Sequence, residues 1–138
     1  MAYDTNNIFA KILRGEAPCI KVYEDDKTFA FMDVMPQAEG HVLVIPRAPA
    51  ENLFELPADD YAALAKTTQK IAGAVKRAIG SPGLMIAQLN GAEAGQTVFH
   101  IHNHVIPRWS GIEMKLHARE MADMNELEEQ AQKIRAEL

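Results

Sequence analysis

The chain reads Thr97-Val98-Phe99-His100-Ile101-His102-Asn103-His104-Val105-Ile106-Pro107-Arg108 from residue 97 to residue 108. The β-branched and aromatic residues of this run predict a strand over 97–106. Because strand side chains alternate between two faces, His100, His102 and His104 are expected to project from the same face. His41 lies in a second predicted strand, over 41–46, so four of the five histidines fall in such runs. Imidazoles gathered on one face suit an anionic ligand, and phosphate is the obvious candidate.

The rest of the pattern predicts grouped hairpins and a few helices. A short helix is expected over 5–15, with Thr5 or Asn6 as its cap, and a longer helix over 58–79 that Gly80 ends. Two strands are expected within 20–34, and a further strand over 83–89. Residues 125–138 keep an apolar stripe at helical spacing, which indicates packing against the sheet or a partner subunit. Five strands that do not alternate strictly with helices indicate an α+β class.

Length and composition fit one globular domain over residues 1–138. The chain is 48% hydrophobic and 24% charged, which is ordinary for such a domain. A net charge of −5 argues against a nucleic-acid-coating surface but allows one nucleotide in a pocket. No secretory signal and no membrane-spanning run is visible. The single cysteine, Cys19, rules out an internal disulfide, so a cytoplasmic location is expected.

Three interpretations of the histidine run compete. A purely structural role would bury adjacent titratable groups at a cost that Val or Ile avoids. One metal ion does not reach all three rings, because His100 and His104 are about 13 Å apart along a strand at ~3.3 Å per residue. Phosphorus chemistry fits better, since a neutral imidazole with a pKa of ~6.5 is a nucleophile near neutral pH. The glycine-containing loop 90–97 leads into the run and lets backbone N–H groups approach an anion.

With these residues in hand, the chain resembles the histidine triad (HIT) family. The family signature is His-φ-His-φ-His-φ-φ, where φ is apolar, and residues 100–106 match it except at Asn103. The resemblance extends over nearly the whole chain and includes residues 8–12, 29–33, 40–46 and 93–98. The opening segment is similar to the Hint-type phosphoramidases, whereas residues 93–108 are similar to the Fhit-type dinucleoside polyphosphate hydrolases.

This resemblance implies a HIT-like fold, namely a homodimer with a five-stranded antiparallel sheet, a long helix and a C-terminal helix in each subunit. It implies hydrolysis at the α-phosphate of a purine nucleotide, with no metal or other cofactor, through a covalent intermediate on His102. His104 is expected to contact the α-phosphate oxygens. His100 and His41 are expected to orient the ring of His102, and Gln96 to contact the departing group or the attacking water.

The resemblance also implies a nucleotide-binding set. Asp33 is expected to bind the ribose hydroxyls. Asn90 and the backbone of Gly95, Gln96 and Thr97 are expected to hold the phosphate. Five apolar residues are expected to form the walls around the base: Ile8, Phe9, Ile12, Phe31 and Leu43.

Two departures from the family pattern carry expectations of their own. Asn103 should lie on the face opposite the histidines and needs a hydrogen-bond partner there if it is buried. Some relatives have a Cys-x-x-Cys in the first helix that contributes to a structural zinc site. Asn7 and Ala10 occupy those places here, so that zinc site is expected to be absent. His117 is expected to be a solvated helix residue.

The resemblance leaves the function open between classes. The main hypothesis is a hydrolase that acts on dinucleoside polyphosphates or nucleoside phosphoramidates. One alternative is a purine-nucleotide-binding regulatory module with vestigial hydrolysis, and another is a nucleotidyltransferase. Amine, polyphosphate, sulfate and fluoride leaving groups all remain open, and the place of Trp109 in the core, at a dimer interface or beside the pocket is open too.

Overall fold

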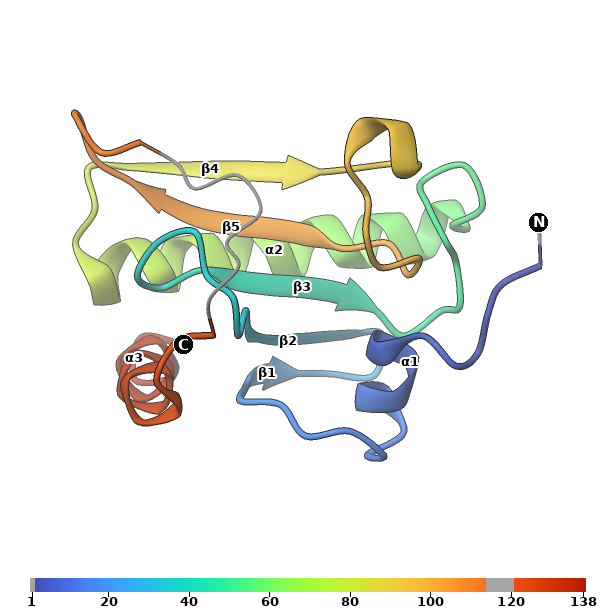
Figure 1. The fold of residues 1–138 in the computed structure, drawn as a ribbon, viewed down its shortest axis with the longest axis horizontal. Coiled ribbons are helices and arrows are strands. Elements are labelled where there is room, and N and C mark those ends of the chain that lie inside the picture. Colours follow the sequence, from blue (N-terminus) through green and yellow to red (C-terminus); the bar gives the residue numbers. More distant parts are fainter. Residues whose placement is uncertain (1, 114–120) are drawn as a thin grey trace.

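The computed structural model describes residues 2–113 and 121–138, which form one antiparallel sheet with helices around it (Figure 1). In chain order the elements are α1 (Ile8–Leu13), β1 (Lys21–Glu24), β2 (Thr28–Met32), β3 (Val42–Pro46), α2 (Ala58–Ile79), β4 (Gly83–Gln88), a short 3-10 helix (Ala92–Ala94), β5 (Asn103–Arg108) and α3 (Met124–Arg135). The strand order is β1-β2-β3-β5-β4. The predicted α+β class and five-stranded antiparallel sheet are confirmed, and His117 lies outside the described residues.

The two faces of the sheet are covered very differently. Alternation along β3 sends Val42 and Val44 toward α2, where they join a fully buried core with Leu64 and Ile71. The opposite face carries a smaller apolar cluster, in which Phe9 and Ile12 of α1 pack against Phe29, Phe31, Leu43 and Ile45. Figure 1 shows α2 along one face and the short α1 at one end of the other. The face that α1 covers only in part has room for a ligand.

The helices follow the predicted pattern with changes at their ends. Asn7, and neither Thr5 nor Asn6, caps α1, because its side-chain oxygen accepts the N–H of Ala10 at 2.9 Å. The long helix spans 58–79 as predicted, and Gly80 ends it in the left-handed conformation, with φ of 74°. The C-terminal helix stops at Arg135. The described residues contain no helix that is both long and apolar enough to cross a membrane.

The predicted strand over 97–106 is wrong in its first half. Asn103 is the first residue of β5 and pairs with Val44 on one side and Gln88 on the other. Before it, the chain leaves the sheet, and the Ile101 N–H donates to the carbonyl of Ala50 at 2.9 Å. Of the three histidines, only His104 lies in the strand, and His41 directly precedes β3.

Asn103 meets the expectation derived from the sequence. Its side chain is buried on the α2 side of the sheet, opposite the site. The amide donates to the Thr68 hydroxyl at 3.0 Å and accepts from the Gln88 amide at 2.8 Å. The polar residue therefore links β5 to α2 and β4 with its hydrogen-bonding groups satisfied.

A glycine between β2 and β3 brings two distant elements together next to His41. Gly40 has φ of +82°, and a Cβ there would lie 2.6 Å from Ile79 Cγ1 at the end of α2.

We expect Gly40→Ala to lower the free energy of unfolding by about 2–4 kcal/mol, because the cost of the strained backbone and the cost of overpacking add. Chemical denaturation measures this change. Gly15→Ala is the matched control, since Gly15 has φ of +78° with open space around it. Equal losses in both variants would contradict the role of the Ile79 contact.

Candidate active site

A cavity of about 1100 Å³ opens on the sheet face opposite α2. Its lining includes ten of the residues that the sequence placed in the site: Ile8, Phe9, Ile12, Phe31, Asp33, Leu43, Gly95, Thr97, His102 and His104. The other four expected residues, His41, His100, Asn90 and Gln96, do not line it. The fold therefore brings α1, the sheet and the loop before β5 around one space.

His102 presents one ring nitrogen for chemistry. Its Nδ1 lies 2.7 Å from the carbonyl oxygen of His100, so Nδ1 carries the proton and donates it to that carbonyl. The lone pair of the neutral ring is therefore on Nε2. The Phe9 ring packs edge-on against the imidazole, with centroids 4.9 Å apart, and holds its plane. Burial lowers the pKa of His102, so the ring is neutral at pH 7.

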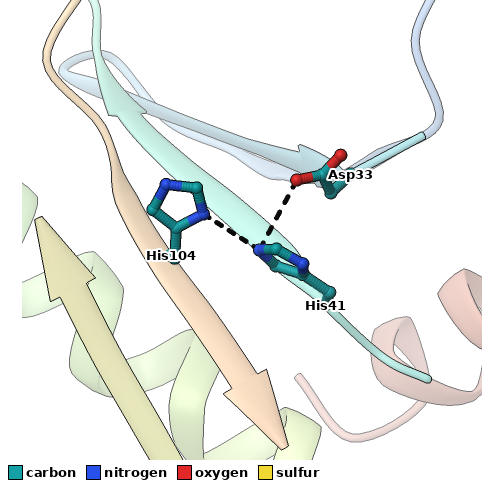
Figure 2. Close-up of side chains that lie close together, drawn as sticks. All are labelled: Asp33, His41 and His104. Carbon is teal, nitrogen blue, oxygen red and sulfur yellow. Dashed lines mark hydrogen bonds and ion pairs between the residues drawn. The ribbon is translucent and has the colours of Figure 1, made fainter. Parts of the chain in front are cut away.

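His104 and His41 form a hydrogen-bond relay with a fixed direction. The backbone N–H of Gln37 donates to His41 Nδ1 at 3.0 Å, so the proton of the neutral His41 ring is on Nε2. His41 Nε2 lies 3.0 Å from His104 Nδ1, a contact drawn as a dashed line in Figure 2. His104 Nδ1 is therefore the acceptor of this hydrogen bond. His104 must then carry its own proton on Nε2. The rings of His102 and His104 lie 4.9 Å apart, so a lone pair and an N–H donor sit side by side.

The four clustered histidines are neutral in the free protein. Burial, with a smaller contribution from neighbouring imidazoles, lowers the pKa of His41 to about 3 and that of His104 to about 4. Burial also lowers the pKa of His100 to about 4. The site therefore offers neutral N–H donors to an anion, because a buried cation beside other imidazoles is costly.

Asp33 completes the group in Figure 2. One carboxylate oxygen lies 3.5 Å from His41 Nε2, and the other accepts the Met35 N–H at 2.8 Å. Burial raises the pKa of Asp33 to about 6. Its place in the cavity wall is compatible with contact to a ribose.

By distance alone, Asp33, His41 and His104 could hold a metal ion, because their donor atoms all lie within 4.8 Å of one another. The position of the ring proton on His41 argues against a bound metal ion. A histidine that binds metal through Nε2 keeps its proton on Nδ1 and donates it to an acceptor. His41 Nδ1 instead faces the N–H of Gln37, which is a donor. The group fits a hydrogen-bond relay better than a metal centre.

His100 lies behind His102. Its side chain is fully buried, and Nε2 donates to the Pro46 carbonyl at 2.7 Å. The hydroxyl of Tyr3 lies 2.5 Å from Nδ1. His100 therefore acts on His102 through its backbone carbonyl, and its ring is anchored on the far side.

Gln96 and Asn90 hold the loop before β5 and do not face the cavity. The buried Gln96 amide donates to the carbonyls of Glu51 and Val98, and its oxygen accepts the Gly91 N–H. Asn90 accepts the Leu53 N–H. The predicted contact of Gln96 with a departing group finds no support in this geometry, because both ends of the amide are already bonded.

Sequence reasoning missed two kinds of site residue. Tyr3 and Gln37 each act through one hydrogen bond to a histidine, Tyr3 to His100 across 97 positions of the chain and the Gln37 backbone N–H to His41 within one loop, and no sequence pattern marks either of them. Five methionines also line the cavity, at Met32, Met35, Met85, Met121 and Met124. Isolated apolar residues like these look the same in sequence whether they line a cavity or fill a core.

Comparison with known proteins agrees with this architecture. The model of the HIT domain family matches residues 14–111. This chain belongs to the HIT family. The structure is also similar to that of a Hit-like protein from Bartonella henselae, with a TM-score of 0.93 and 49% identity over 99% of this chain and 100% of that one.

Two HIT-family relatives have names that state an activity. The chain is 38% identical over 117 residues to adenylylsulfatase HINT3 of Arabidopsis thaliana; the match covers 80% of this chain and 59% of that longer protein. It is 39% identical over 101 residues to adenosine 5'-monophosphoramidase hnt1 of Schizosaccharomyces pombe, over 73% of each chain.

The two possible roles of Gln96, holding the loop before β5 or contacting the departing group, predict different effects of Gln96→Ala. We expect Gln96→Ala to lower the free energy of unfolding by about 1–3 kcal/mol, because it leaves the Gly91 N–H and the Glu51 carbonyl without their partner. Thermal or chemical denaturation measures this. Gln132→Ala, at an exposed position of α3, is the control and should change stability by less than about 0.5 kcal/mol. Unchanged stability together with a lower kcat would instead support direct contact with the departing group.

Proposed function

We propose that this protein is a hydrolase that cleaves the bond between the α-phosphorus of a purine nucleotide and its leaving group, through a nucleotidyl intermediate on His102. The observation that carries the proposal is the neutral His102 ring, with its Nε2 lone pair beside the Nε2–H of His104 in the cavity. Membership of the HIT family supports a nucleotide hydrolase in general. The names of HINT3 and hnt1 support adenylyl compounds as substrates.

In the first step, His102 Nε2 attacks the α-phosphorus, and a phosphorus–nitrogen bond forms as the bond to the leaving group breaks. The leaving group departs with the bonding electron pair and takes up one proton. The ring then carries a positive charge, which the His100 carbonyl stabilises through Nδ1–H. In the second step, water attacks the phosphorus, the bond to Nε2 breaks and one proton is released. His104 Nε2–H donates to a phosphate oxygen in both steps.

We place each part of the substrate along the floor of the cavity, which the sheet forms. Phe31, Leu43, His104 and Ala87 pair in sequence across β2, β3, β5 and β4. With phosphate at His104, the base lies toward Phe31 and Leu43, where Ile8, Phe9 and Ile12 of α1 complete an apolar slot. Such a slot suits the faces of a purine. The leaving group lies over β4, beyond His104.

The leaving-group side favours an uncharged group. Met85, Ala87 and Ile106 form its floor. Among the described residues, neither lysine nor arginine lines the cavity. A polyphosphate or sulfate would therefore leave without a cationic partner from these residues, whereas an amine needs none. This side of the cavity supports a phosphoramidate over a dinucleoside polyphosphate.

The test measures, by chromatography, the release of AMP from each of three compounds: adenosine 5'-phosphoramidate, a diadenosine polyphosphate and adenylyl sulfate. We expect the phosphoramidate to react fastest. His102→Ala should lower the rate by on the order of 10³-fold or more, because the nucleophile is removed, while AMP still binds. Calorimetric titration with AMP provides the binding control.

Other outcomes favour the alternative functions. AMP binding without His102-dependent release from any of the three compounds would overturn hydrolysis and favour a nucleotide-binding module. Transfer of the nucleotide to an added acceptor in preference to water would indicate a nucleotidyltransferase. Faster release from the dinucleotide would contradict the assignment of the leaving-group side.

We also propose that the chain forms a homodimer through β4 and α2. β4 is an edge strand, and Ile86 on it is 48% exposed. Ile86 borders a shallow groove with Tyr61, Thr68 and Ala72 of α2.

Sedimentation equilibrium should show a dimer that Ile86→Arg converts to monomer. Phe54→Arg, at a residue 83% exposed outside that groove, is the control and should remain dimeric. Loss of the dimer in the control but not in Ile86→Arg would place the interface elsewhere.

A further inference from the structure

We propose that Tyr3 is a positioning residue of the active site, which fixes the His100 ring and, through the His100 backbone, the hydrogen bond that orients His102. This inference rests on the proposed function. Tyr3 lies in the extended segment before α1, separated by 97 positions in the chain from His100. The structure joins these two segments directly behind the nucleophile.

The contacts of His100 define the donor at each end of its ring. Nε2 lies 2.7 Å from the Pro46 carbonyl, which only accepts, so Nε2 carries the proton. Nδ1 is then an acceptor, and the Tyr3 hydroxyl donates to it at 2.5 Å. The Tyr3 ring meets the His100 ring edge-on, with centroids 5.6 Å apart. Both nitrogens of a fully buried imidazole are therefore satisfied, and one tautomer is fixed.

The coupling to His102 runs through one residue. The same His100 whose ring Tyr3 holds offers its carbonyl to His102 Nδ1–H at 2.7 Å. Phe9 packs edge-on against both rings, with centroids 6.5 Å from His100 and 4.9 Å from His102. Without the Tyr3 hydroxyl, the buried Nδ1 lacks its donor, and the His100 ring gains freedom to turn. Movement of His100 shifts the carbonyl that determines which nitrogen of His102 carries the proton.

Tyr3 acts on His102 through His100 and does not contact the cavity itself. Tyr3 does not line the cavity, so its loss leaves the base slot and the phosphate donors in place. A change in nucleophile orientation lowers the rate of the chemical step without weakening substrate binding. Tyr3 should therefore affect kcat more than KM.

The experiment removes only the hydroxyl, with Tyr3→Phe in the full chain. We expect kcat for adenosine 5'-phosphoramidate to fall roughly three- to tenfold with KM within about twofold of wild type. The ¹⁵N chemical shifts of the His100 ring should change, because Nδ1 loses its donor. Tyr23→Phe is the matched control, since its hydroxyl bonds to Asp25 outside the cavity lining. The control should leave kcat and the His100 shifts unchanged.

Two results would overturn the inference. Unchanged kcat and unchanged His100 shifts in Tyr3→Phe would show that the hydroxyl positions nothing. A parallel loss of thermal stability, kcat and AMP affinity would show a merely structural role. If wild-type protein hydrolyses none of the compounds, the proposed function fails, but the His100 and His102 ¹⁵N shifts still test Tyr3.

Discussion

The end of the β5 ladder at Asn103 is the constraint on which the site depends. From Asn103 onward, β5 pairs with β3 on one side and β4 on the other. Before Asn103, the His100 carbonyl is left to accept from His102 Nδ1, and the Pro46 carbonyl at the end of β3 accepts from His100 Nε2. A strand continued through residue 97 would have used the His100 carbonyl in the sheet and left the tautomer of His102 undefined.

These hydrogen bonds allow the clustered histidines to be buried as neutral rings. Each of the four clustered histidines has at least one ring nitrogen matched to a group of fixed hydrogen-bonding character, so a neutral ring is satisfied in a position where a cation would be costly. The matching sets direction as well as charge. The bonds from Gln37 to His41 and from His41 to His104 leave an N–H donor on His104 Nε2. The bond from His102 Nδ1 to the His100 carbonyl leaves a lone pair on His102 Nε2. The same residue type therefore presents a lone pair at His102 and an N–H donor at His104, because their hydrogen-bond partners differ.

The sheet also separates recognition from chemistry. Under the proposed function, α1, β2 and β3 build the apolar base slot, His102 and His104 at the start of β5 meet the phosphate, and β4 with Met85 forms the other half of the cavity. HIT family membership is consistent with this division, because the histidine run that carries the family signature lies between the two halves. Flexible methionine side chains can adapt to apolar groups of different shape.

The sequence by itself determined the α+β class, the five strands, the long helix that ends at Gly80 and the residue types of the site, because periodicity and the histidine run are local signals. It also identified Asn103 as a polar residue that needs a partner on the far face. It did not determine where β5 begins, since propensity favours a strand from residue 97 and only the pairing with Val44 and Gln88 ends it at Asn103. Nor did it give the roles of Tyr3, Gln37 and Gln96. Tyr3 and Gln96 meet partners distant in the chain, whereas the Gln37 N–H meets His41 through the shape of one loop. In each case only the folded structure decides which donor meets which acceptor.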